Sequence, residues 1–287
     1  MERNDLCWCG SGKKYKKCHM PIEEKIIFYA SKGCDVPDRE ILKTIDEIEG
    51  IRKSAALNSA VLDEVAKNIH AGMCTEEINT IVHEFTVSHG GIPAPLDYEG
   101  FPKSVCTSVN DVICHGIPDK ETILKDGDII NVDVSTILDG YFSDASRMFC
   151  IGEVSEEAAR LVKVTEECVL LGLKEAKPWN FIGDIGNAIN THAKENGYSV
   201  VRDIGGHGIG LEFHEDPFVS YVSKPKTEML LVPGMCFTIE PMINQGTHKY
   251  TVDKKNGWTV RTKDHKLSSQ IEYMVLITDD GAEILTK

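Results

Sequence analysis

No stretch of this 287-residue chain approaches the ~20 consecutive apolar residues that cross a lipid bilayer, so the sequence excludes a membrane-spanning protein. The opening residues, MERNDLCWCG, also lack the apolar core of a secretory signal, and we expect a cytoplasmic protein with no membrane partner. Excess positive charge is missing too. The 31 Lys and Arg residues face 45 Asp and Glu residues, and the net charge of −14 argues against a protein that coats nucleic acid.

The cysteines predict one local metal site rather than a disulfide scaffold. Ten of them are spread through a mid-sized chain, which favours free thiols. In residues 1–20, however, the pattern CxCx8CH brings together Cys7, Cys9, Cys18 and His19, and four soft or borderline ligands this close suit tetrahedral zinc. The alternative is a set of reduced surface thiols. The segment CWCGSGKKYKKCH resembles the SEC-C zinc motif, which implies one structural zinc ion.

The remaining chain is expected to hold a linker and one larger domain. A proline near each end of residues 21–37 and little periodicity between them predict a linker, so the second domain covers residues 38–287. Apolar residues at helical spacing predict a helix within residues 41–69. Thr75 is expected to cap a second helix, which ends at Gly90.

An internal repeat is the strongest signal of architecture. A shift of 107 residues aligns TEEINTIVHEFTVSHG with IGDIGNAINTHAKENG, and LKDGDIINVDV with LVPGMCFTIEP. The second pair places Asp133 on Glu240. One offset that preserves helix, glycine, strand and carboxylate indicates two related halves. Two such halves would form an α+β domain with pseudo-two-fold symmetry, its strands inside and acids from both halves at the centre.

Residues 127–149, GDIINVDVSTILDGYFSDASRMF, predict a β-hairpin. A turn centred between Leu138 and Asp139 would place Asp133 directly opposite Asp144, with both carboxylates on one face. Two like charges about 5 Å apart repel each other, so this face needs a shared proton or a cation. The alternative is a solvated hairpin whose acids point to water.

Three further residues extend these acids into a metal-binding set. His207 lies between the glycines of GGHGIG, while Glu240 in TIEPM and Glu272 in SSQIEYMVLIT lie inside strand-like apolar runs. An acid in such a run is seldom buried without a partner. His207 alone could be an ordinary core histidine. Together with Asp133 and Asp144, however, the set offers the ligands of two divalent ions about 3.5 to 4 Å apart, which hold a water for attack on a carbonyl.

The motifs NVDVS, GYFSDASRMF, CHGIP, GGHGIG, FHEDP, FTIEPM and SQIEY occur in this order and closely resemble type I methionine aminopeptidases. The resemblance covers about residues 38–287 and implies the pita-bread fold of the creatinase and aminopeptidase group. It implies that Asp144 and Glu272 bridge two metals, that Asp133 chelates one, and that His207 and Glu240 complete the other. It also implies that Glu240 shuttles a proton.

The same resemblance assigns the residues that meet the substrate. His115 would lie beside the amine and the scissile peptide, and His214 would stabilise the tetrahedral intermediate. A methionine pocket suited to a thioether would be formed by Tyr98, Phe101, Cys106, Phe213 and Trp258. These five could equally be ordinary core residues. Pro95 stands where bacterial members often have cysteine, which affects only the rim of the pocket.

The implied function is hydrolytic removal of the initiator methionine from nascent proteins with a small second residue, by a monomer carrying two active-site ions of Co, Mn, Fe or Zn. One alternative is an X-Pro peptidase of the same fold, and another is a metal-free binding module, which would have lost ligands.

Residues 1–20 carry a charge of +3 and leave −17 for the rest, with four lysines between the ligand pairs. This basic patch predicts docking on a polyanion, such as the ribosome's RNA. The alternative is a solvated tail without a partner.

Overall fold

The computed structural model describes all 287 residues, and the two helices of the first half form close to where the sequence places them. Helix α2, Ile45–Asn68, begins at a capping box in which Thr44 Oγ1 accepts from Glu47 N at 3.3 Å and Glu47 Oε2 accepts from Thr44 N at 2.6 Å. Helix α3, Thr75–Ser88, has Cys74 and not Thr75 at its N-cap, so the predicted cap was wrong by one residue. Thr75 lies in the first turn and its hydroxyl donates to the Asp119 carbonyl at 3.0 Å.

The predicted hairpin is present as β4, Ile129–Leu138, and β5, Tyr141–Cys150, but its predicted register was wrong. The turn consists of Asp139 and Gly140, whose φ angles of 52° and 85° fit the two-residue turns that Asp-Gly sequences favour. Asp133 therefore pairs with Ser146, and Asp144 with Ser135. The two acids are diagonal neighbours on one face instead of direct partners.

This hairpin lies in a nine-stranded sheet ordered β1-β4-β5-β14-β9-β7-β8, in which β2 also pairs with β4 and β15 with β14. Two three-stranded sheets, β13-β10-β6 and β11-β12-β3, complete the strands. The remaining strands are β1 Ile92–Pro93, β2 Cys106–Val109, β3 Val112–Cys114, β6 Ser199–Val200, β7 Gly206–Gly208, β8 Glu215–Val219, β9 Cys236–Ile239, β10 Met242–Asn244, β11 Tyr250–Val252, β12 Val260–Thr262, β13 Ser268–Gln270, β14 Glu272–Ile277 and β15 Ala282–Ile284.

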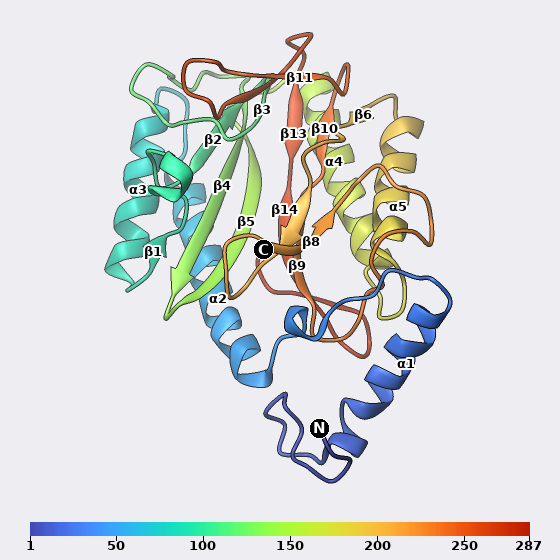
Figure 1. The fold of residues 1–287 in the computed structure, drawn as a ribbon. Coiled ribbons are helices and arrows are strands. Elements are labelled where there is room, and N and C mark those ends of the chain that lie inside the picture. Colours follow the sequence, from blue (N-terminus) through green and yellow to red (C-terminus); the bar gives the residue numbers. More distant parts are fainter.

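Helices α2 and α3 flank the first half of the sheet, and α4, Glu156–Glu175, with α5, Ile182–Glu195, flank the second (Figure 1). Buried apolar side chains form one main cluster in each half. The first includes Ile78 and Val132, and the second includes Ile185 and Ile239. The sheet is thus held between two helix pairs, with one hydrophobic core behind each half.

The predicted two-half arrangement is confirmed at the level of single hydrogen bonds. Both α3 and β4 begin 107 residues before their counterparts α5 and β9. The isolated bridge Cys74–Ile123 has its counterpart in Phe181–Leu230, again at the same offset. The glycines at 127 and 234 share positive φ angles of 95° and 99°. The offset read from the sequence is therefore a structural repeat.

The segment expected to be a linker, residues 21–37, is largely helical. Helix α1 spans Met20–Ser31, and Tyr29 stacks on Trp179 with ring centroids 6.2 Å apart. Lys25 Nζ lies 3.8 Å from the centroid of the Trp179 ring, so α1 packs against the second half through an aromatic and a cation–π contact. None of the helices is both long enough and apolar enough to cross a lipid bilayer.

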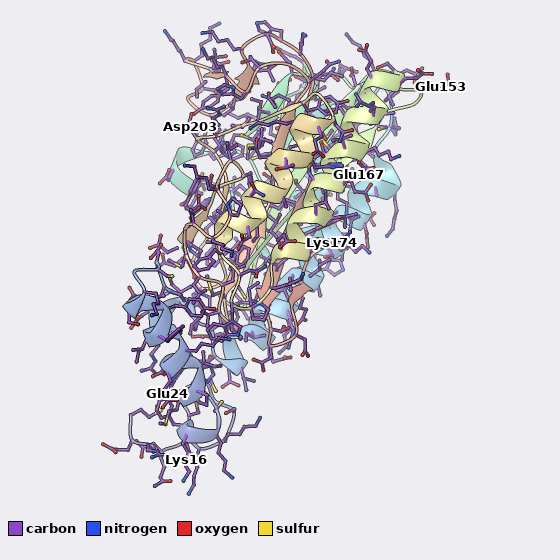
Figure 2. All side chains as sticks on the ribbon, turned by 90° about the vertical axis from the view of Figure 1, so that its right-hand side faces the viewer. Lys16, Glu24, Glu153, Glu167, Lys174 and Asp203 are labelled. Carbon is purple, nitrogen blue, oxygen red and sulfur yellow. The ribbon has the colours of Figure 1, made fainter.

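Residues 1–20 lie at one end of the molecule, beyond helix α1. Figure 2 shows Lys16 at this tip and Glu153 at the opposite end. The segment is attached to the larger domain, because the Cys9 carbonyl accepts from Ile45 N at 2.9 Å at the start of α2. Short 3₁₀ turns at Tyr15–Lys17, Arg39–Ile41 and Tyr98–Gly100 complete the secondary structure.

Candidate metal centre and substrate pocket

Five neighbouring strands each bring one predicted ligand to the same face of the sheet. In the sheet order β4-β5-β14-β9-β7, these strands carry or lead directly into the five residues. The residues are, in that order, Asp133, Asp144, Glu272, Glu240 and His207. Glu240 follows β9 directly, and the other four lie within their strands. The structure therefore brings the five predicted ligands together, although they are far apart along the chain.

The ligand atoms of this group are close enough to share cations. Single ligand atoms of Asp144, His207 and Glu272 lie within 4.8 Å of one another. His207 Nε2 lies 3.8 Å from Asp144 Oδ2 and 3.8 Å from Glu240 Oε1. His207 Nδ1 lies 3.0 Å from the Gly208 carbonyl, to which it donates, and this leaves the Nε2 lone pair facing the acids.

Burial disfavours the charged form of each of the four acids. It raises the pKa of Asp133 to about 7 and that of Glu240 to about 8. Burial, followed by the neighbouring carboxylates, raises the pKa of Asp144 and of Glu272 well above the usual range. Burial lowers the pKa of His207 to about 4, so this imidazole is a neutral ligand at pH 7.

Two of these acids also have an oxygen that nothing in the protein satisfies. Asp133 Oδ1 and Glu272 Oε1 are buried and have no hydrogen-bond partner. A buried carboxylate oxygen without a donor is costly unless a cation coordinates it. Four carboxylates carry the charge that two divalent cations would neutralise, and oxygen with one imidazole nitrogen is a donor set that such ions accept. The residues present thus fit a dinuclear centre.

Four residues that the sequence reasoning did not select hold the ligands in place. Ser135 donates to Asp144 Oδ1 at 2.9 Å. Thr238 donates to Glu240 Oε1 at 2.7 Å, and Gln270 donates to Glu240 Oε2 at 3.0 Å. The Tyr221 hydroxyl accepts from Glu240 N at 2.8 Å. Ser135 and Thr238 could have been found by period-two spacing, because each lies two residues from a ligand on the same strand face. Tyr221 has no such signal.

A cavity of about 510 Å³ lies over this centre. All the predicted active-site residues line it, together with the rim residue Pro95. They are the five ligands and His115, His214, Tyr98, Phe101, Cys106, Phe213 and Trp258. The alternative that the last five are ordinary core is therefore not supported, because they face an open cavity.

The apolar part of the cavity is built from edge-to-face aromatic contacts. Phe101 and Trp258 have ring centroids 5.3 Å apart, and Tyr98 and Phe213 are 4.8 Å apart. The thiol of Cys106 is buried, which raises its pKa well above the usual range and keeps it neutral. This combination of rings and a thiol suits an unbranched, polarisable side chain.

The two predicted substrate histidines flank this wall. His115 lies 6.0 Å from Trp258 between ring centroids, at an unusual φ of 54°, and burial lowers its pKa to about 4. His214 Nδ1 lies 2.9 Å from the Tyr98 hydroxyl, and its ring is 4.3 Å from that of His207. Burial also lowers the pKa of His214. Both imidazoles are therefore available as neutral hydrogen-bonding groups.

The N-terminal cluster is a second candidate metal site. Cys7 Sγ lies 3.2 Å from His19 Nδ1, Cys18 Sγ lies 3.3 Å from the same nitrogen, and Cys9 Sγ is 3.6 Å from Cys18 Sγ. All four cysteine and histidine ligand atoms lie within 4.8 Å of one another, and the thiols are free. Tetrahedral zinc with bonds of ~2.3 Å to sulfur separates its sulfurs by about 3.8 Å, which these distances approach.

Comparisons with known proteins agree with this geometry. The profile of metallopeptidase family M24 matches residues 49–279, and that of the SEC-C motif matches residues 3–21. Methionine aminopeptidase A of Synechocystis sp. is 52% identical over 240 residues, 84% of this chain and 94% of that protein. A methionine aminopeptidase of Chlamydia trachomatis is 43% identical over 294 residues, 100% of this chain and 99% of that protein.

A solved structure extends the agreement to the fold. The crystal structure of methionine aminopeptidase from Rickettsia prowazekii matches with a TM-score of 0.84 at 43% identity, and the match covers 86% of this chain and 99% of that one. The expected pita-bread fold is thereby confirmed. The sequence profile, the relatives and the fold together show that this chain belongs to metallopeptidase family M24, a family of metal-dependent hydrolases.

Proposed function

We propose that this chain is a methionine aminopeptidase, which removes the initiator methionine from nascent proteins whose second residue is small. One observation carries the proposal: a single cavity combines a cluster of four buried acids and a histidine with an aromatic pocket that contains a thiol. The identities of 43–52% to methionine aminopeptidases support it.

We assign the metal-binding roles as the resemblance implies. Asp144 and Glu272 would bridge two divalent ions, Asp133 would chelate one of them, and His207 with Glu240 would complete the other. When bound, such ions polarise a peptide carbonyl and lower the pKa of a coordinated water. Cobalt, manganese, iron and zinc all accept these ligands. The chain's own part is to keep the acids oriented, which the hydrogen bonds to Asp144 and Glu240 accomplish.

The remaining residues bind substrate and move protons. The methionine side chain would enter the pocket of Tyr98, Phe101, Cys106, Phe213 and Trp258. His115 would contact the amine and the scissile peptide. His214 would donate a hydrogen bond to the oxygen that becomes negative, with its other nitrogen held by the Tyr98 hydroxyl. Glu240 would take and return a proton at the cleaved bond, as the resemblance implies.

A direct experiment combines metal content with activity. Protein purified without added metal is assayed for divalent metals and for methionine release from Met-Ala-Ser, alone and with each of the four metals. We expect methionine release that a chelator abolishes and that one or more of these metals restore. If none of the metal-loaded forms releases methionine, the proposed function is wrong.

The X-Pro alternative predicts a different preference and is tested with the same preparation. The non-enzymatic alternative required lost ligands, and all five ligand positions keep acids or histidine and meet in one cavity. The observation that favours an N-terminal methionine is the aromatic and thiol lining of the cavity, because an X-Pro peptidase selects the proline after the cleaved bond and not an apolar side chain before it.

For residues 1–20 we propose a zinc-folded docking module. Its four ligands would hold one structural zinc, which a segment too short for its own core needs in order to fold. Lys13, Lys14 and Lys17 are exposed, and Lys16 is partly exposed. Lys16 lies at the tip of the molecule (Figure 2). A basic tip on an acidic chain favours a polyanion, and for an enzyme of nascent chains we propose the ribosome's RNA. The protein would act as a cytoplasmic monomer.

A further inference from the structure

A buried ion pair between Lys43 and Glu215 lies beside the cavity, and neither residue is a proposed metal ligand or substrate-binding residue. The side chain of Lys43 is only 1% exposed, and its ammonium group contacts Glu215 Oε2, with Glu215 14% exposed. Lys43 precedes the capping box of α2, and its backbone N donates to the Gly234 carbonyl at 2.9 Å. The lysine is thus fixed from both sides, and Glu215 is its only charged partner.

The other oxygen of Glu215 organises the turn that precedes it. Glu215 Oε1 accepts from Leu211 N at 2.6 Å and from Glu212 N at 2.9 Å. One carboxylate therefore joins two backbone amides to a buried ammonium group. The turn is also restricted at Gly210, where a Cβ atom would lie 2.6 Å from Ile51 Cδ1 and 3.3 Å from Lys43 Cε. The lysine stem and its charge both contact this turn.

The next two residues of the turn form the cavity wall. Phe213 packs against Tyr98 with ring centroids 4.8 Å apart, and His214 contacts the Tyr98 hydroxyl at 2.9 Å. Consecutive Cα atoms are about 3.8 Å apart, so a shift of Glu215 is passed directly to His214. Glu215 also pairs with Gly208, the residue after His207, which ties the turn to the metal-binding strand.

We propose that Lys43 is a positioning residue. Through Glu215 it fixes the part of the cavity wall formed by Phe213 and His214, the Phe213–His214 wall, at its position relative to the metal-binding acids. This inference rests on the proposed function of the cavity. A buried ion pair often adds little net stability, because desolvating two charges offsets their attraction. What it provides here is a fixed geometry, and a wall displaced by about 1 Å can cost on the order of a hundredfold in rate.

The test compares four variants of the full-length, metal-loaded protein. Lys43→Met keeps the apolar stem but removes the charge, and Lys43→Arg keeps the charge. Glu215→Gln keeps the size of the side chain and one oxygen that can accept from the turn amides, but it removes the negative charge that faces Lys43. Arg52→Met is the matched control, because Arg52 on α2 pairs with Glu283 and does not line the cavity. Each variant is measured for kcat and KM on Met-Ala-Ser, for metal content, and for amide hydrogen exchange at Leu211 and Glu212.

We expect Lys43→Met to lower kcat at least about tenfold, because His214 would contact the reacting oxygen, and to raise KM by a smaller factor, because Phe213 belongs to the pocket. Exchange at the two turn amides should rise at least about tenfold, while metal content and exchange in β4 stay at the wild-type level. Lys43→Arg should restore both readouts. Glu215→Gln should resemble Lys43→Met, and Arg52→Met should resemble the wild type.

Two results would overturn the inference. The first is wild-type kcat and wild-type exchange at Leu211 and Glu212 in Lys43→Met. The second is a uniform loss of protection across the protein with unchanged kcat per folded molecule, which would show a purely structural role. Failure of the proposed function looks different, because the wild type would then release no methionine, and the exchange data would still decide whether Lys43 orders the turn.

Discussion

The metal-free protein should become less stable as pH rises. Ordinary ion-paired acids have the opposite effect, because they make a folded protein more stable as pH rises. A carboxyl group with a higher pKa in the folded than in the unfolded state makes the folded state bind more protons, so the free energy of unfolding falls with rising pH. Burial raises the pKa of Asp133 from 3.8 to about 7 and that of Glu240 from 4.5 to about 8. Buried His115 and His207, with pKa values lowered from 6.5 to about 4, act in the opposite sense, mostly below pH 6.5, and still offset about 1 kcal/mol between about pH 6.5 and about pH 8.5.

The informative window therefore lies above pH 6.5, and the size of the effect can be calculated there. From about pH 6.5 to about pH 8.5, integrating the proton uptake gives about 1 kcal/mol from Asp133 and about 2 kcal/mol from Glu240. Asp144 and Glu272, whose pKa values burial raises further, add to this loss. For a chain of this size, the net loss of about 2 kcal/mol that remains after the offset by the two histidines corresponds to a fall in Tm of about 4 °C, to which Asp144 and Glu272 add.

The assay measures Tm by thermal unfolding, monitored by circular dichroism, for chelator-treated and for metal-loaded protein at several pH values. Metal-loaded protein should not show the fall, because deprotonated carboxylates are the ligands and metal binding strengthens with pH. In an Asp133→Asn, Glu240→Gln double variant, the Tm of the metal-free protein should fall less steeply with rising pH. A metal-free wild-type Tm that is constant or rises across this window would refute the reasoning.

The other predictions concern the ligands, the pocket and the N-terminal tip. Asp133→Asn or Asp144→Asn should lower the metal content and should lower turnover of Met-Ala-Ser by at least about a hundredfold while the fold persists, since each removes a charged ligand, and near-normal turnover would contradict the dinuclear assignment. Met-Ala and Met-Gly substrates should be cleaved well and Leu-Ala and Met-Lys poorly, whereas an X-Pro dipeptide as best substrate would favour the alternative peptidase. Replacing the four lysines in residues 1–20 with glutamine should abolish a salt-sensitive co-sedimentation with ribosomes and leave activity on short peptides unchanged, and equal sedimentation of both forms would exclude docking.

The features predicted correctly from sequence are those encoded by periodicity. The helical stripe of α2, the alternation in β4 and the 107-residue offset each reflect a repeated apolar pattern, and the structure keeps all three. The hairpin register was missed because it depends on turn geometry: Asp139 and Gly140 both adopt positive φ, and shifting the turn by one residue moves the pairing by two without changing faces. The acids therefore stayed on the right face despite the wrong partner.

The helix in residues 21–37 was missed for a different reason. None of its side chains is fully buried, so its apolar pattern is weak, and its contacts are with residues distant in sequence, such as Trp179. The same limit applies to the groups that orient the ligands. Gln270 and Tyr221 reach Glu240 only because β9, β13 and the segment after β8 come together in the fold, and no local pattern reports this.

The position of the proposed metal centre explains why the two halves need each other. In the nine-stranded sheet the halves meet only where β5 pairs with β14, through Ser146 with Glu272 and Ala145 with Tyr273. Glu272 belongs to this short seam, and Asp144 directly precedes it on β5. Ions shared by Asp144 and Glu272 would therefore join the halves across a seam of only two residue pairs. Because each half supplies an acid at the same repeat position, Asp133 in one and Glu240 in the other, neither half alone can assemble the centre, and the symmetry of the fold becomes a requirement of the chemistry.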